Sequence, residues 1–207
     1  MIVEDHQLII EGLCRLFDMN HSFEVVCVAK KAEEARLFMR NNEVDLIIMD
    51  IQLPHKDGKD SGLELTKELI TLYPDLIILI NSQHAEVEFV RRAMEAGARG
   101  YLLKGSDISI IRSAIDTVIA GNIYFDPNLP ERPKPIPHGQ TLTAKEKEVM
   151  KLIAQWETNE KIAEKLGIKI TGLNSHRCNI MYKLGLSNAI EVLHEAIKRY
   201  GDLNNQD

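Results

Sequence analysis

Acidic side chains follow two apolar segments whose pattern predicts parallel strands. Glu4 and Asp5 follow the first segment, and Asp50 ends another, DLIIMD. In a doubly wound sheet of strand order 2-1-3-4-5, the carboxyl ends of the first and third strands are neighbours at the point where ligands bind. Three carboxylates at such a point repel one another, and a divalent cation relieves that repulsion. Because the ligand atoms are oxygens, we expect a hard ion such as Mg²⁺.

Two further polar side chains are expected at the same edge of the sheet. Ser82 follows the fourth apolar segment, and Lys104 follows the fifth. A phosphoryl group in transfer spreads negative charge over three oxygens, which cations and hydrogen-bond donors offset. A hydroxyl, an ammonium group and a metal ion beside a carboxylate therefore predict phosphoryl transfer to Asp50.

Short apolar segments alternate with amphipathic ones through residues 1–125. This alternation predicts an α/β domain with a doubly wound, five-stranded parallel sheet. The continuous apolar runs LIIM and LIILI are typical of strands covered on both faces. The expected strands are Met1–Glu4, Phe23–Ala29, Leu46–Asp50, Leu76–Ile80 and Gly100–Leu103. The expected helices are Gln7–Asp18, Ala32–Asn41, Gly62–Leu72, Val87–Ala96 and Ile108–Ala120.

The remaining chain divides into a linker and a helical domain. Residues 126–140 hold five of the seven prolines, which predicts a semi-rigid, extended spacer. Residues 141–207 show only helical periodicity, so we expect a small all-α domain of four helices. Thr143 and Glu146 have the spacing of a capping box. The expected helices are Ala144–Gln155, Asn159–Leu166, Thr171–Leu184 and Asn188–Tyr200.

The second and third of these helices, with the turn at Gly167, form a predicted helix-turn-helix unit. The apolar side chains of its second helix can supply its core. The polar side chains expected on or beside the exposed face are Asn174, Ser175, Arg177 and Cys178. A helical bundle that binds another protein has the same pattern, so the pattern alone leaves that alternative open.

Composition limits the class of protein. With 44% apolar and 27% charged residues, the 207-residue chain can form ordinary globular cores. The longest apolar runs are far too short to span a membrane, and no basic-then-apolar leader opens the chain. The three cysteines lack CxxC spacing. We therefore expect a cytoplasmic protein with reduced thiols and no membrane partner.

The overall charge of −6 argues against wholesale nucleic-acid binding, but its distribution is uneven. Residues 1–125 carry 20 acidic and 13 basic side chains, whereas residues 141–207 carry 9 acidic and 10 basic ones. This asymmetry indicates two domains with different partners.

Four segments, VEDH, DLIIMDIQLP, Ser82–His84 and AGARGYLLK, resemble the receiver domain of two-component response regulators. The resemblance covers about residues 1–122. It implies that Asp50 accepts a phosphoryl group from a histidine kinase. It further implies that Asp5, Asp50 and the backbone carbonyl of Gln52 hold Mg²⁺, with Glu4 assisting through water.

By the same resemblance, Ser82 and Lys104 contact the phosphoryl oxygens, and Tyr101 is the aromatic residue that turns inward on activation. His84 is a loop residue that is expected to tune access to the site. The sequence departs from the family after Pro54, where about four extra residues around 59–62 lengthen the loop beside Asp50. That departure bears on kinase docking and on the lifetime of the phosphate.

The segments LTAKEKEVMKLIA, NEKIAEKLGI and SHRCNIMYKLGL resemble the LuxR-type DNA-binding domain. Together with a receiver domain, this is the architecture of the NarL/FixJ subgroup of response regulators. The resemblance implies that the helix near Thr171–Leu184 enters the DNA major groove. The candidate contacts to base edges are Asn174 and Ser175, with Cys178 beside them, and the candidate phosphate contacts are Lys169, Arg177 and Lys183. Thr171, at the start of this helix, is a further candidate DNA contact.

These residues predict a transcription regulator whose DNA binding and homodimerisation are controlled by phosphorylation of Asp50. Gly172 stands where the LuxR-type family usually has Thr. An aspartate-based phosphatase is a weaker alternative, because Gln52 occupies the place of its second aspartate. A regulator that binds DNA without being phosphorylated is a third hypothesis, against which the set of Glu4, Asp5, Asp50, Ser82 and Lys104 argues.

Overall fold

The structure is a computed structural model that describes residues 1–18, 22–54, 61–131, 142–186 and 189–201. Its first part contains a parallel sheet in the order β2-β1-β3-β4-β5-β6. The strands are β1 (Ile2–Val3), β2 (Val28–Ala29), β3 (Leu46–Met49), β4 (Ile77–Ser82), β5 (Gly100–Leu103) and β6 (Tyr124–Phe125). The predicted order 2-1-3-4-5 is confirmed, and one more strand extends the sheet beyond β5.

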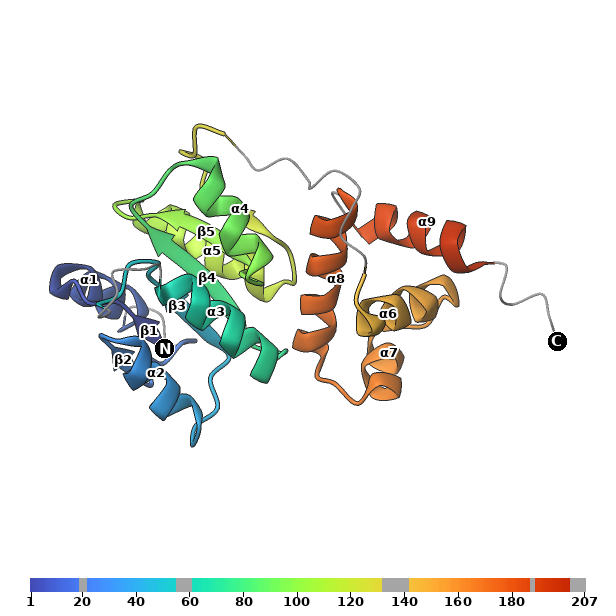
Figure 1. The fold of residues 1–207 in the computed structure, drawn as a ribbon, viewed down its shortest axis with the longest axis horizontal. Coiled ribbons are helices and arrows are strands. Elements are labelled where there is room, and N and C mark those ends of the chain that lie inside the picture. Colours follow the sequence, from blue (N-terminus) through green and yellow to red (C-terminus); the bar gives the residue numbers. More distant parts are fainter. Residues whose placement is uncertain (19–21, 55–60, 132–141, 187–188, 202–207) are drawn as a thin grey trace.

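Helices cover both faces of this sheet (Figure 1). One apolar core includes residues from α2 (Ala32–Met39), α3 (Ser61–Leu72) and α4 (Val87–Glu95). The other core includes residues from α1 (Gln7–Asp18) and α5 (Ile108–Ile119). Because β4 is buried along its whole length, its sequence is a continuous apolar run rather than an alternating one.

The sheet differs from the sequence expectation at two strands. The second strand includes only Val28–Ala29 of the predicted Phe23–Ala29; Phe23 instead makes an edge-to-face contact with Phe17, with ring centroids 5.8 Å apart. The sixth strand is only two residues long, too short for a period-2 pattern, and it forms because Tyr124 pairs with Gly100 and Phe125 with Tyr101.

The first residues of the predicted spacer pack on the α/β part. The Asp126 side chain is fully buried and accepts hydrogen bonds from the Leu103 and Asn128 backbone N–H groups. Leu129 is also buried. Most of the proline-rich segment, residues 132–141, lies outside the described residues, so the boundaries 1–125, 126–140 and 141–207 stay predictions.

Within the described residues 142–186 and 189–201 four helices follow, as predicted for the second part: α6 (Ala144–Ala154), α7 (Asn159–Leu166), α8 (Ile170–Leu184) and α9 (Ala189–Tyr200). The capping box is present, because Thr143 Oγ1 accepts a hydrogen bond from the Glu146 N–H and the Glu146 carboxylate accepts one from the Thr143 N–H. Gly167 and Gly185 end α7 and α8 in the left-handed conformation that glycine adopts at low cost.

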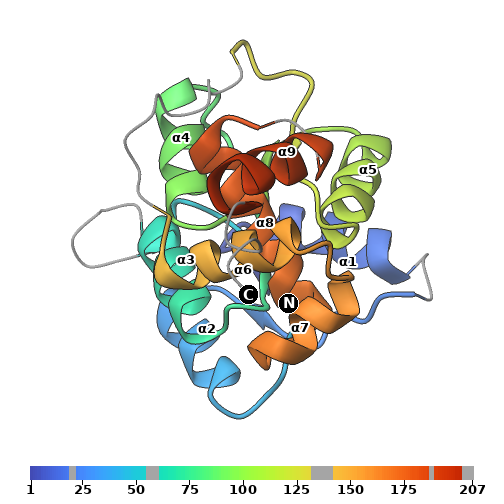
Figure 2. The same ribbon diagram turned by 90° about the vertical axis from the view of Figure 1, so that its right-hand side faces the viewer.

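The helix α8 lies between the α/β part and the other helices of the second part (Figures 1 and 2). It contacts the α/β part at Asp75, which precedes β4, and at Gly121, which follows α5, and so away from the strand ends that carry Asp50 and Lys104. The Cys178 thiol of α8 donates a hydrogen bond to the Gly121 carbonyl oxygen, which follows α5, at 2.7 Å. None of the helices in the described part of the chain is both long and apolar enough to cross a membrane.

Candidate functional site

The backbone of the sheet brings two buried carboxylates together at the carboxyl ends of β1 and β3. The Asp50 N–H donates to the Val3 carbonyl at 2.9 Å, and the Glu4 N–H donates to the Ala29 carbonyl at 3.0 Å. Only 2% of Asp50 and 1% of Glu4 is exposed to solvent. Two carboxylates withdrawn from water in this way need a cation nearby.

Lys104 supplies a positive charge between them. Its Nζ lies 2.7 Å from Asp50 Oδ2 and 2.9 Å from the Glu4 carboxylate. Burial pulls the pKa of Lys104 down, but the hydrogen bonds to Asp50 and Glu4 outweigh this and raise it. Burial also raises the pKa of Asp50; Lys104 offsets part of that rise, and the Glu4 charge adds to it.

The same carboxylates can hold a divalent metal ion. Atoms of Glu4, Asp5, His6 and Asp50 that can act as ligands all lie within 4.8 Å of one another. The donors from the three acids are oxygens, which fits Mg²⁺. Gln52 is anchored beside them, because its N–H donates to Asp50 Oδ1 at 3.1 Å; the role of its carbonyl oxygen as a ligand stays a prediction.

Sequence reasoning did not single out His6. Its Nδ1 lies 3.0 Å from Glu4 Oε1 and 2.9 Å from Asp5 Oδ1. The signal that could have found it is adjacency, because His6 directly follows the acidic pair. The side chain is largely exposed, so it sits at the solvent side of the cluster.

Ser82 ends β4, the strand next to β3, and Tyr101 lies on β5, the following strand of the sheet. Ser82 is buried, and its Oγ accepts a hydrogen bond from the His84 N–H at 3.2 Å. Tyr101 is fully buried, and its hydroxyl donates to the His84 carbonyl oxygen at 2.8 Å. The Tyr101 side chain therefore already has the inward position that was expected only on activation. His84 stacks on Phe89, with ring centroids 4.0 Å apart, so packing as well as loop position holds it.

The start of α3 approaches Asp50 closely. A methyl group at Gly62 would overlap with the Asp50 carbonyl oxygen, and the Gly62 N–H donates to the Ile51 carbonyl at 3.0 Å. Glycine at this position allows the long loop to return to the helix beside the acidic cluster. Residues 55–60 of that loop lie outside the described residues.

The α8 face that was predicted to be exposed is covered by the α/β part. Ser175 and Cys178 are buried, and Asn174 is half-buried. Asn174 lies close to Gly121. A methyl group added at Gly121 would come within 2.9 Å of three side-chain atoms of Asn174. The prediction of exposure was wrong for this arrangement, because helical periodicity cannot tell a face open to solvent from one that contacts another domain.

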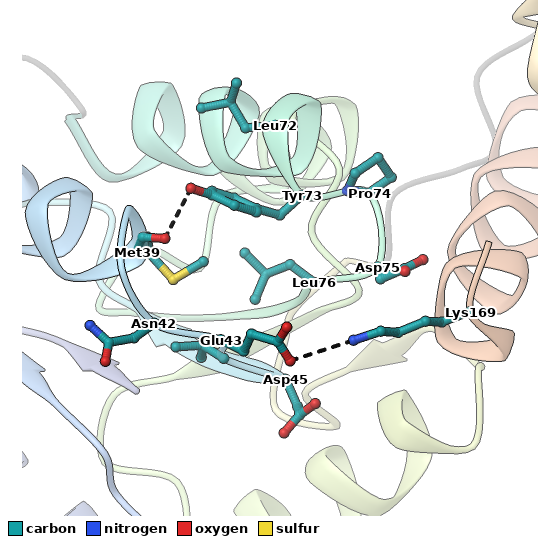
Figure 3. Close-up of a pocket in the computed structure, with 11 residues that line it drawn as sticks. Met39, Asn42, Glu43, Asp45, Leu72, Tyr73, Pro74, Asp75, Leu76 and Lys169 are labelled. Carbon is teal, nitrogen blue, oxygen red and sulfur yellow. Dashed lines mark hydrogen bonds and ion pairs between the residues drawn. The ribbon is translucent and has the colours of Figure 1, made fainter. Parts of the chain in front are cut away.

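The basic candidates on α8 have partners in the protein. Lys183 Nζ lies 2.8 Å from both oxygens of Glu146, the capping-box glutamate, which is itself buried. Arg177 donates to Asn159 Oδ1 at 2.6 Å. Lys169 reaches across to Glu43 of the α/β part, 3.7 Å away (Figure 3). The backbone of Thr171 is helical, and its side chain lies outside the described part.

Two family models match the chain. The response regulator receiver domain matches residues 1–116, and the luxR family of bacterial regulatory proteins matches residues 140–196. Transcriptional regulatory protein DegU of Brevibacillus brevis is 30% identical over 96% of this chain and 92% of its own length. Transcriptional regulatory protein DesR of Bacillus subtilis is 33% identical over 93% and 92%.

Solved structures have the same fold. A two-component response regulator of the LuxR family from an Aurantimonas species is 34% identical, with a TM-score of 0.57 over 62% of this chain and 89% of that one. Two RcsB dimers bound to two parallel DNAs include a chain that is 22% identical, with a TM-score of 0.58 over 93% and 94% of the two chains. At that identity, the second likeness concerns the fold alone.

A receiver fold with carboxylates and a lysine at its carboxyl edge, followed by a helix-turn-helix domain, defines a DNA-binding response regulator of a two-component system. This chain belongs to the NarL/FixJ subgroup of that family, whose members combine a receiver domain with a LuxR-type DNA-binding domain.

Proposed function

We propose that Asp50 is the phosphoacceptor and that a sensor histidine kinase is the donor. One Asp50 carboxylate oxygen attacks the phosphorus atom, and the bond from phosphorus to the donor nitrogen breaks. The support is the position of Lys104, whose charge lies 2.7 Å from Asp50 Oδ2. Once Asp50 is phosphorylated, this ammonium group can pair with a phosphoryl oxygen instead, with Ser82 as a further donor.

Mg²⁺ is the metal ion that the acidic cluster fits, and it would offset the negative charge of the incoming phosphoryl group. Asp5 and Asp50 would hold it, with Glu4 assisting and His6 at the solvent side. An enzyme that turns over phosphate esters would need a general acid near the nucleophile. Gln52 stands where the aspartate-based phosphatases have that acid, so we assign this chain a regulatory role.

DNA is the second partner that we propose, and α8 is the helix that reads it. The observation that carries the gating model is the burial of Cys178 against the receiver domain, where its thiol donates to the Gly121 carbonyl oxygen. A helix face in contact with protein cannot enter a DNA groove. DNA binding therefore requires that α8 leave the receiver domain, and phosphorylation shifts an equilibrium between docked and released states.

The switch is more than the rotation of one aromatic side chain. Tyr101 already points inward while α8 is docked, so inward Tyr101 alone does not release the helix. We infer that the phosphoryl group must also draw Ser82 toward it and take over the pairing of Lys104, which already lies 2.7 Å from Asp50 Oδ2. Released DNA-binding domains would then pair as a homodimer on half-sites centred about 10 base pairs apart.

Fluorescence anisotropy with a specific and a scrambled duplex tests the gating model. We expect beryllofluoride, which mimics the phosphoryl group, to tighten specific binding and to steepen its dependence on protein concentration. The control is Asp50→Asn, which cannot bind beryllofluoride. Equal affinity with and without beryllofluoride at every protein concentration would contradict gating and favour a regulator that binds DNA without phosphorylation.

A further inference from the structure

Gly172, the third residue of α8, lies close against the receiver domain. A methyl group at Gly172 would overlap with Asp75 Oδ1 and lie 2.7 Å from Asp75 Cγ. The three atoms nearest to such a methyl group all belong to Asp75, and the third is Oδ2 at 3.5 Å. In the docked position of α8, a side chain at residue 172 would therefore have to displace the Asp75 carboxylate.

The backbone at Asp75 has little freedom to move away, so room for a methyl group at residue 172 would have to come from rotation of the short Asp75 side chain. Asp75 follows Pro74 in the turn between α3 and β4, and the Leu76 N–H closes this turn on the Tyr73 carbonyl at 3.0 Å. The Tyr73 hydroxyl donates to the Met39 carbonyl at 3.0 Å, which fixes the turn from the other side. Figure 3 shows Asp75 beside the start of α8, close to Lys169.

One oxygen of the Asp75 carboxylate lies inside the contact, although the residue as a whole is half-buried. Its Oδ1 is buried and has no hydrogen-bond partner within the described ranges of the chain. The fully buried Arg99 feels the charge of Asp75 and lies beside the Cys178 thiol. An arrangement of this kind depends on close fit, because buried groups at native packing density cannot be displaced cheaply.

A glycine inside α8 needs a reason, because glycine is less favourable in a helix than any residue except proline. Gly172 does not stabilise the helix itself. What glycine provides is the close approach of the α8 backbone to the receiver domain. Gly121 provides a second such approach on the receiver side, against Asn174, but its φ of +83° makes it unsuitable for substitution.

We propose that the absence of a side chain at Gly172, opposite Asp75, is what allows α8 to dock on the receiver domain before activation. Glycine at residue 172 permits the docked state, and a larger residue at this position releases α8 from the receiver domain. This inference rests on the proposed role of α8 in reading DNA. It adds the two residues whose sizes set the position of the equilibrium between docked and released states.

Alkylation of Cys178 measures this release without DNA or phosphate. The thiol is 1% exposed and points at Gly121 of the receiver domain, so release makes it reachable. The full-length protein is treated with N-ethylmaleimide, and peptide mass mapping follows each cysteine. Cys14 and Cys27, which lie in the receiver domain, are the internal references.

Gly172→Ala should accelerate the labelling of Cys178 about tenfold, because overpacking a close contact commonly shifts an equilibrium by about that factor. Gly12→Ala is the matched control, since a methyl group there meets nothing within 4 Å in the middle of α1. Asp75→Ala alone should leave Cys178 protected. The double variant Asp75→Ala with Gly172→Ala should restore protection, because the atoms that clash are gone.

The proposal is overturned if Gly172→Ala leaves the labelling rate of Cys178 at the wild-type value. It is also overturned if the double variant labels as fast as Gly172→Ala, or if Asp75→Ala by itself exposes the thiol. Thermal melting of each variant identifies any loss of folding, which an alanine inside a helix should not cause. Failure of gating would show separately, as release of α8 in Gly172→Ala without tighter DNA binding.

Discussion

Lys104 Nζ lies 2.7 Å from Asp50 Oδ2, and the same ammonium group lies 2.9 Å from the Glu4 carboxylate. One cation therefore pairs with two buried acids, which follow two different strands. This relationship gives Lys104 a structural role before any phosphoryl group arrives, and it makes the stability of the receiver domain depend on the charge state of the acidic cluster.

Lys104→Met should destabilise the receiver domain by about 3 kcal/mol at pH 7.5, because it leaves buried carboxylates without their cation. The loss should shrink as the pH falls. The pKa of Asp50 is raised in the folded protein, so protonation favours the folded state at low pH, and ionisation costs stability as the pH rises through that pKa. Urea unfolding of the wild type and of Lys104→Met at pH 7.5 and pH 5 measures the loss of stability at each pH.

The matched control is Arg36→Met, which breaks a half-exposed ion pair with Glu68. That change should cost less than about 1 kcal/mol at either pH. An equal loss for Lys104→Met at the two pH values would mean that packing of the lysine side chain, and not charge, explains its effect.

Asp50→Asn should raise the stability of the metal-free receiver domain and abolish its response to Mg²⁺. The amide removes an acid whose ionised form is costly in the folded protein, since burial raises its pKa. In the wild type, Mg²⁺ at ten times its dissociation constant should add about 1.4 kcal/mol. Thermal melting with and without Mg²⁺ measures this difference.

The same pair of proteins tests the phosphoacceptor. With a small phosphodonor and Mg²⁺, intact-mass analysis should find one phosphate on the wild type and none on Asp50→Asn. Omitting the metal ion should stop the gain in the wild type as well. The same phosphate gain in Asp50→Asn would assign the chemistry to another residue.

Lys183→Ala should destabilise the helical domain by about 2 kcal/mol, because it leaves the buried Glu146 carboxylate without its cation. The capping box that begins α6 uses the same glutamate. Chemical denaturation followed by circular dichroism measures the loss, and Lys145→Ala, at a more exposed position, is the control. A stable Lys183→Ala variant with weakened binding to all DNA sequences would restore the phosphate-contact role expected from the sequence.

Limited proteolysis should cut within residues 132–140 and release two folded pieces, because proline-rich segments between domains are common cleavage sites. Residues 126–129 should be protected, since Asp126 and Leu129 are buried against the sheet. Mass spectrometry of the fragments locates the cut. A first cut within residues 55–60 would instead make the long loop beside Asp50 the most accessible segment.

The strand order and the position of the acidic cluster could be predicted from the sequence because both depend on local patterns. Continuous apolar runs mark buried parallel strands, and a residue that follows such a strand must lie at the carboxyl edge of the sheet. Asp50, Glu4 and Lys104 meet there for that reason. The helices of the second part followed equally from periodicity, with Thr143 and Gly167 marking where they begin and end.

Only the tertiary structure decided what these elements contact. A periodic helix has the same sequence whether its polar face meets solvent, DNA or another domain, so the burial of Ser175 and Cys178 could not be foreseen. The partner of Lys183 and the inward position of Tyr101 depend on residues far away in the chain. The close approach of Gly172 to Asp75 is likewise a matter of shape between two domains, which local patterns do not record.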